Sequence, residues 1–164
     1  MKKNRSGGLS LTLVGGFVLA ALIISFWFLS AQSNQEKSIV VLQPGNASIV
    51  ALGKKVYLAN CASCHGKALE GQANWRKPDN EGYMPAPPHN EEGHTWHHSD
   101  NYLFLITKYG IESIIGQKYP NNMPAYDGQL SDKEIVAVLS YIKSTWSERI
   151  QRFHDQINKQ AKND

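Results

Sequence analysis

Cysteine is scarce in this chain: Cys61 and Cys64 are the only two among 164 residues. A framework of structural disulfides is therefore excluded. An excess of charge of one sign is also missing from most of the chain. Lys2, Lys3 and Arg5 account for three of the 17 basic residues, and the other 14 balance 14 acidic residues. This balance predicts no nucleic-acid partner and no strong charge steering.

The first 33 residues form a segment of a different kind. They begin with three basic residues, and no charged residue follows until Glu36. The run from Leu9 to Ala31 is mostly apolar, and about 20 apolar residues suffice to cross a hydrocarbon core of about 30 Å. The run is longer than the apolar core of about 7–15 residues in a cleaved signal. We predict a transmembrane anchor within residues 1–33, with a signal cleaved near Ser33 as the alternative. In both cases the basic end stays in the cytoplasm.

The sharpest motif is Cys61-Ala62-Ser63-Cys64-His65, a C-x-x-C-H run that uses both cysteines. Two thiols at this spacing can add to the two vinyl groups of one haem, and the imidazole of His65 then lies beneath the iron as a ligand. The motif predicts one covalently attached haem c.

Two other kinds of site use paired cysteines. A redox dithiol needs no following histidine and normally opens a helix within a βαβ pattern, which we do not find. A zinc site would need a second pair of ligands. The histidines that can supply that pair, or bind a separate second metal, are His89, His94, His97 and His98.

The chain beyond residue 33 is predicted to be a linker followed by a helical domain. Residues 34–46 form the linker, and Asn46 can cap the first helix of the domain. Apolar residues then recur at helical spacing, at Ile49, Leu52, Val56 and Ala59. The domain is assigned to residues 47–146.

The middle of the domain alternates between loop and helix. Residues 66–99 contain four prolines and no hydrophobic period, which predicts a long ordered loop around the haem edge. Ser99 or Asp100 can cap a middle helix that ends at Gly110. A second loop is predicted over residues 111–129.

The last helix has the clearest start. Ser131 and Glu134 have the spacing of a capping box, in which each side chain satisfies a backbone N–H group of the other residue. The apolar spacing continues through Ile157. This continuity predicts a helix that runs past the domain into a C-terminal helical extension of residues 147–164.

The sixth position on the iron is predicted to be filled by methionine. A thioether opposite His65 would raise the reduction potential. Met123 lies in a loop, is followed by Pro124, which stiffens the backbone, and precedes the last helix. Met84 lies only 19 residues beyond His65, which leaves little chain to pass around the macrocycle. We predict Met123 as the ligand, with Met84 or one of the loop histidines as alternatives.

Around these motifs the chain resembles the class I cytochrome c family. Gly53 and Tyr57 ahead of Cys61 match its G-x-x-x-Y/F-x-x-x-C-x-x-C-H pattern, and the run from Met123 to Tyr126 matches its M-P-x-F/Y loop. Further matches are Leu130 to Ile135 and Tyr141-Ile142, in the terminal helix. The loop runs P-A-P-P-H from Pro85 and G-H-T-W-H-H from Gly93 resemble a membrane-anchored bacterial subgroup.

The resemblance implies an all-α cytochrome c fold, with three or more helices around one covalent haem, here preceded by an N-terminal transmembrane helix. The first and last helices would cross near Gly53 and Tyr141. A backbone carbonyl beside Pro87 or Pro88 would accept a hydrogen bond from the proximal imidazole. Trp96 would donate to a haem propionate.

The function predicted from these features is electron transfer, not enzymatic catalysis. The chain would be a membrane-anchored monohaem cytochrome on the periplasmic side of the bacterial inner membrane. Its partners would be a quinol-oxidising complex upstream and a terminal oxidase or another periplasmic reductase downstream. One alternative is a haem subunit of a larger oxidase or dehydrogenase complex, suggested by the extended last helix. Another is a haem-based sensor, although the chain has no room for an output module.

Overall fold

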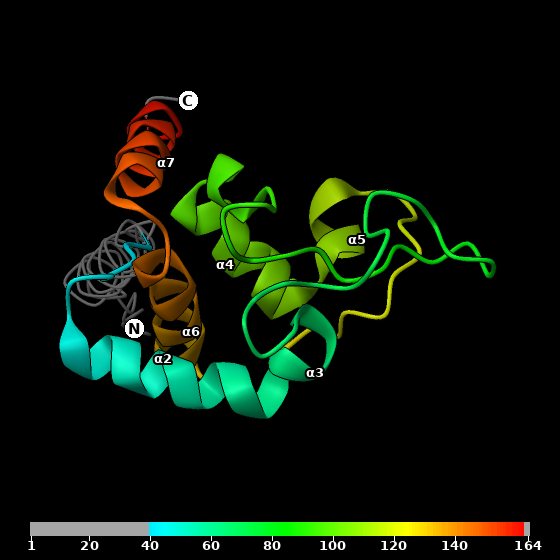
Figure 1. Ribbon diagram of the computed structural model, residues 1–164, viewed down its shortest axis with the longest axis horizontal. Coiled ribbons are helices and arrows are strands. Elements are labelled where there is room, and N and C mark those ends of the chain that lie inside the picture. The colour runs from blue at the N-terminus through cyan, green and yellow to red at the C-terminus, as the bar shows by residue number, and fades with distance from the viewer. Residues whose placement is uncertain (1–39, 163–164) are drawn as a thin grey trace, which may run out of the picture. The chain divides into compact units, whose positions relative to one another are not determined.

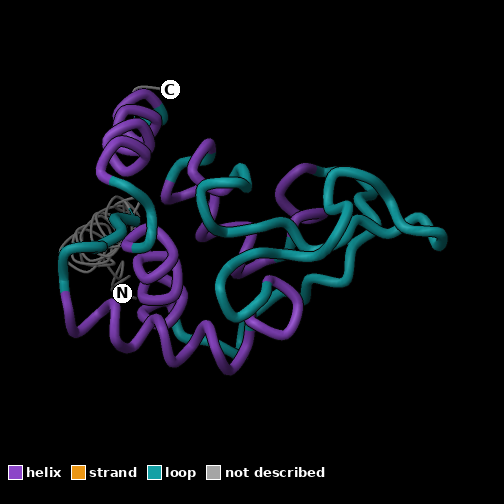
Figure 2. Tube along the Cα trace, in the orientation of Figure 1, coloured by secondary structure: helices purple, strands orange, loops and turns teal. Residues whose placement is uncertain are grey.

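The computed structural model describes residues 40–162, which form a helical domain (Figure 1). Its elements are α2 (Ala47–Asn60), α3 (Ala62–His65), the 3-10 turn η1 (Thr95–His97), α4 (Asp100–Tyr109), α5 (Ile111–Ile115), α6 (Asp132–Ser144) and α7 (Glu148–Gln160). Within this range Figure 2 shows helices and loops but no strand, and the all-α prediction is confirmed.

The predicted transmembrane segment, residues 1–33, lies outside the described residues. Among residues 40–162, no helix combines the length and the apolar character that a bilayer crossing requires.

Helices α2 and α6 cross at close range, and Gly53 makes the crossing possible (Figure 1). A Cβ atom at Gly53 would lie 1.9 Å from the carbonyl oxygen of Ala137 and 2.8 Å from the Cβ atom of Tyr141. A glycine inside a helix costs about 1 kcal/mol relative to alanine, and the close approach of the two backbones is its structural reason. The predicted crossing near Gly53 and Tyr141 is confirmed.

The hydrophobic core lies around this crossing and extends to α4 and the start of α7. Burial of these side chains is the main favourable contribution to the stability of the domain. Its principal members are Val56, Tyr57, Leu103, Phe104, Ile135, Val138, Leu139, Ile142, Trp146 and Ile150.

The predicted helix starts are borne out by hydrogen bonds. The side chain of Asn46 accepts from the backbone N–H of Ile49. Ser99, not Asp100, is the cap of α4, because its Oγ accepts from the N–H of Tyr102. Both bonds of the capping box between Ser131 and Glu134 are present.

Two expectations about helix extent are wrong. The predicted loop 111–129 contains the short helix α5 directly after Gly110. The last helix does not continue through residue 157: α6 ends at Ser144, and α7 is a separate helix that packs against η1. At the break, the indole N–H of Trp146 donates to the carbonyl oxygen of His89, with 2.8 Å between the two atoms. This contact with a distant segment accompanies a change of direction that spacing alone does not reveal.

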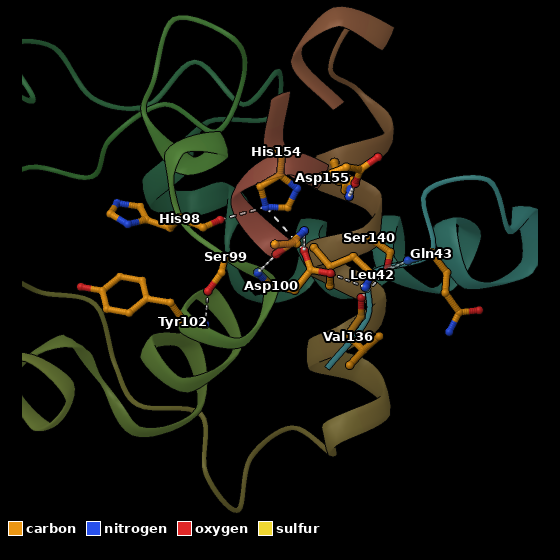
Figure 3. Close-up of polar contacts among 12 residues, drawn as sticks. Leu42, Gln43, His98, Ser99, Asp100, Tyr102, Val136, Ser140, His154 and Asp155 are labelled. Atoms are coloured by element: carbon orange, nitrogen blue, oxygen red, sulfur yellow. Dashed lines mark hydrogen bonds and ion pairs between the residues drawn. The ribbon is translucent and has the colours of Figure 1, made fainter. Parts of the chain in front are cut away.

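A buried carboxylate joins the two ends of the described domain (Figure 3). Asp100 is 5% exposed, and its Oδ2 accepts from the backbone N–H of Leu42 at 2.9 Å. Its Oδ1 accepts from the side-chain amide of Asn158 in α7 at 2.9 Å. Nearby, Nε2 of His154 lies 2.8 Å from the carbonyl oxygen of His98, and Nδ1 of His154 is buried without a hydrogen-bond partner. The linker at Leu42, the start of α4 and α7 therefore share one polar cluster.

Candidate haem site

The C-x-x-C-H motif forms a tight turn at the end of α2. Cys61 is the last residue before the one-turn helix α3, and its carbonyl oxygen accepts from the N–H groups of Cys64 and His65. Residues three apart on a helical turn are neighbours, so the two sulfur atoms belong to one side of the turn. The hydroxyl of Tyr57 donates to the carbonyl oxygen of Gly66 at 2.8 Å, which ties the end of the motif back to α2.

His65 presents one free nitrogen. Its side chain is buried, and Nδ1 lies 2.8 Å from the carbonyl oxygen of Pro87. A carbonyl can only accept, so Nδ1 carries the proton and Nε2 keeps its lone pair for a metal. Burial lowers the pKa of His65, and the bond to Pro87 partly opposes this; the neutral, ligating form is favoured. The predicted carbonyl partner is confirmed, and it is that of Pro87.

The loop that carries Pro87 is fixed close to the motif by backbone contacts. The N–H of Gly71 donates to the carbonyl oxygen of His65 at 2.8 Å, and the N–H of His89 donates to that of Leu69 at 2.9 Å. Gly71 has a φ of 70°, and a Cβ atom there would lie 2.4 Å from the nitrogen of Pro88. Any side chain at position 71 would clash with the backbone at Pro88, so glycine is required there.

The structure brings the two candidate methionines into neighbouring loops. Met84 forms an isolated parallel bridge with Asn121, and its N–H donates to the carbonyl oxygen of Pro120 at 2.9 Å. The N–H of Met123 donates to the side chain of the same Asn121 at 2.9 Å. The short separation between His65 and Met84 in sequence therefore does not keep Met84 away from the Met123 loop.

Tyr126 anchors the Met123 loop to the attachment turn. Its side chain is 7% exposed, and its hydroxyl donates to the carbonyl oxygen of Asn60 at 2.8 Å. Its N–H donates to the carbonyl oxygen of Thr107 in α4. Burial, followed by the charges of Cys61 and Cys64, raises the pKa of Tyr126 to about 12. Sequence reasoning included Tyr126 in a motif but did not foresee this link.

A cavity of about 350 Å³ adjoins the site. It lies beside Pro87, whose carbonyl oxygen holds His65. Its polar lining groups can bind an anionic substituent, and its apolar ones can face a flat ring. The lining residues are Trp75, Arg76, Met84, Pro85, Pro87, His94 and Tyr119.

Comparison with known protein families assigns the chain to one of them. The family model for cytochrome c matches residues 50–146. The chain belongs to the cytochrome c family. A cytochrome c-552 from Thermus thermophilus is 32% identical over 114 residues, which cover 66% of this chain and 69% of that protein. The cytochromes c6 of Chlorolobion braunii and Tetradesmus obliquus are each 34% identical over 95 residues, covering 57% of this chain and 86% of theirs. No solved structure matches.

Membership of the family establishes the cofactor class and the activity. This cytochrome carries covalently bound haem c, for which Cys61 and Cys64 have the required spacing. It is a monohaem electron-transfer protein rather than an enzyme. The side chains of the site fit that cofactor. The two thiols on one turn can become thioethers, and Nδ1 of His65 is bonded to Pro87 while Nε2 is free to bind iron.

The redox-dithiol alternative does not fit this cytochrome. Burial, followed by the charge of Cys64, raises the pKa of the Cys61 thiol to about 11. Cysteines that exchange disulfides have a lowered pKa, because the thiolate is the nucleophile.

The four loop histidines are spread over separate aromatic partners. His89 stacks on His65, His94 on Trp75, His97 on Trp96 and His98 on Tyr102. Across residues 40–162, no three His, Cys, Asp or Glu side chains come together in a way that would hold a metal ion.

The structure gives the indole of Trp96 a backbone partner, where a haem propionate was expected. Its indole N–H donates to the carbonyl oxygen of Glu91, with 3.3 Å between the two atoms. The single donor of the indole is therefore already used by the backbone five residues earlier.

Proposed function

We propose that this cytochrome c is anchored in the bacterial inner membrane by one helix and presents its haem domain in the periplasm. The proposal rests on the basic start and the apolar run from Leu9 to Ala31 within residues 1–33. A tether of this kind keeps the domain at a high local concentration near membrane complexes. Because acidic and basic residues balance beyond Arg5, proximity rather than charge steering would govern encounters.

The electrons would pass between respiratory partners. A quinol-oxidising complex would be the donor, and a terminal oxidase or another periplasmic reductase the acceptor. The alternative of a subunit within a larger oxidase or dehydrogenase was suggested by the extended last helix. Helix α6 ends at Ser144 and α7 packs against η1, so this feature no longer favours the alternative.

The iron ligands in this proposal are His65 and Met123. When bound, the haem supplies a one-electron iron couple. The chain contributes the rest: Cys61 and Cys64 would hold the ring, and the Pro87 carbonyl orients His65 and makes it a stronger donor to the iron. The observation that carries the choice of Met123 is the Tyr126 anchor, which fixes the M-P-x-Y loop against Asn60, the residue before the attachment turn.

The ligand assignment is tested by the absorption spectrum of the oxidised holoprotein. Methionine bound to ferric haem gives a weak band at long wavelength. We expect Met123→Ala to abolish this band and Met84→Ala, the matched control in the neighbouring loop, to retain it. The reverse pattern would transfer the role to Met84, and a band that survives both changes would exclude methionine ligation.

The membrane assignment is tested by cell fractionation with haem staining. The full chain should sediment with the membranes. A chain in which a cleavable signal replaces residues 1–33 should yield the same haem protein in the soluble periplasmic fraction, with slower electron delivery to the oxidase. Haem protein in the soluble fraction from the full chain would contradict the anchor and favour a cleaved signal.

A further inference from the structure

A second imidazole lies flat against the proximal histidine. The ring centroids of His65 and His89 are 4.0 Å apart, and the two ring planes differ by 22°. This is a face-to-face stack between a proposed iron ligand and a residue from the loop that carries Pro87. The carbonyl oxygen that binds His65 belongs to Pro87, two residues before His89, so one short segment contacts both the edge and the face of the same ring.

His89 is held in this position from several sides. Its N–H donates to the carbonyl oxygen of Leu69 at 2.9 Å, and its Nδ1 lies 2.9 Å from Oγ1 of Thr95. Its own carbonyl oxygen accepts from the indole of Trp146 at 2.8 Å, and the ring of Tyr57 meets it edge-on at 6.3 Å between centroids. Contacts to its backbone, its ring nitrogen and its ring edge therefore hold the side chain of His89 in one position.

We propose that His89 is a positioning residue that fixes the plane of the His65 imidazole by stacking on it, and thereby tunes the reduction potential of the haem. This inference depends on the proposed function, in which His65 ligates the iron.

The hydrogen bond to Pro87 and a bond to iron would still leave the plane of the His65 ring free to rotate. The bond from Nδ1 to Pro87 restrains one end of the His65 ring, and a metal bond at Nε2 would restrain the other. Neither restrains rotation of the ring about the line through these two nitrogens. A flat partner against the ring face does restrain it, because rotation would drive the ring edge into the stacked imidazole. The ring plane decides how the imidazole orbitals overlap with those of the iron, and supporting contacts of this kind tune metal sites.

The C-terminal extension takes part in this restraint. Trp146 lies between α6 and α7, and its ring meets that of His154 in α7 edge-to-face at 5.2 Å between centroids. Just after it, the N–H of Ser147 donates to the carboxylate of Glu91. The break between α6 and α7 therefore holds the segment from His89 to Glu91, which gives the α7 region a role that sequence analysis could not assign.

The test compares full-length holoproteins by two measurements, the reduction potential and the electron paramagnetic resonance spectrum of the oxidised haem. We expect His89→Leu to shift the potential and to change the g-value spread, because the flat face is lost. His89→Phe, the matched control that restores a flat face, should return both quantities most of the way to wild type. Trp146→Phe, which removes the indole N–H donor to His89 together with part of the buried ring, should produce a smaller shift in the same direction as His89→Leu.

The outcomes separate this inference from the proposed function. A folded His89→Leu protein with unchanged potential and unchanged g values would overturn the inference while leaving the ligands intact. If His89→Leu does not fold, His89→Asn provides the same test, because its amide can still bond Oγ1 of Thr95 while the ring that stacks on His65 is lost; an unchanged potential and unchanged g values would again refute the role. A wild-type spectrum without low-spin histidine–methionine character would instead refute the proposed ligand set before any variant is compared.

Discussion

Replacing Gly53 by alanine tests the helix crossing on which the domain depends. The added Cβ atom would lie 1.9 Å from the carbonyl oxygen and 2.5 Å from the carbonyl carbon of Ala137. Favourable contacts between carbon atoms lie at about 3.5–4.0 Å, so α2 and α6 would have to move apart by well over an ångström. Both atoms belong to the backbone of α6, and no side-chain rotation can relieve the clash.

The expected loss of stability follows from two opposing terms. Alanine gains about 1 kcal/mol over glycine in a helix, whereas overpacking of a core typically costs about 1–3 kcal/mol and sometimes more. Because the clash here is with rigid backbone, we place it at or above the upper end of that range. We therefore expect a net loss of about 2–3 kcal/mol in the free energy of unfolding.

Chemical denaturation of the holoprotein measures this loss. The midpoint should fall for Gly53→Ala while the dependence on denaturant stays the same. Gly45→Ala is the matched control, because it lies before α2 and an added Cβ there has nothing within 4 Å. Equal stability of Gly53→Ala and Gly45→Ala would refute the argument that backbone contact at the crossing requires glycine.

Three further predictions follow from contacts described above. Ser131→Ala should lower the free energy of unfolding by about 1 kcal/mol, because the bond from the N–H of Glu134 to the Ser131 hydroxyl is lost; an unchanged denaturation midpoint would show that the cap contributes nothing. Tyr126→Phe should lower the free energy of unfolding by about 1 kcal/mol, because the bond to Asn60 is lost. On heating, the long-wavelength band should disappear at a lower temperature than in wild type. A band that persists to the wild-type temperature would contradict the anchor. Burial, followed by the charge of Lys143, lowers the pKa of His154 below 6.5. The unfolded chain therefore binds a proton at this histidine more readily than the folded protein does. The free energy of unfolding should consequently fall as the pH drops below about 6.5. His154→Gln should reduce that dependence on pH, and equal slopes in the two proteins would rule out His154 as its source.

Much of the site was predictable because its determinants are local. The attachment motif, the cap at Asn46 and the box at Ser131 each lie within a few residues. The carbonyl of Pro87 was reached through a family resemblance and is confirmed by its distance to His65. These features depend on residue type and spacing, which a sequence displays directly.

The remaining features depend on distant contacts. Helix α5 has five residues, too few for a periodic pattern to be recognised. The break after Ser144 leaves the apolar period intact, and it is associated with the bond from Trp146 to His89, 57 residues away. Trp96 donates to Glu91 because of the local path of the loop, which composition does not specify. The stack of His89 on His65 likewise needs the fold to bring the two rings together.

The carboxylate of Asp100 has a practical consequence for shortening this protein. Leu42 reaches it from one end of the domain and Asn158 from the other, so trimming either end removes a donor from the same buried acid. A loss of that kind costs about 1–3 kcal/mol and more for a charged group. A soluble fragment that keeps its fold should therefore start ahead of Leu42 and extend past Asn158, even though both lie far from the haem-binding motif in sequence.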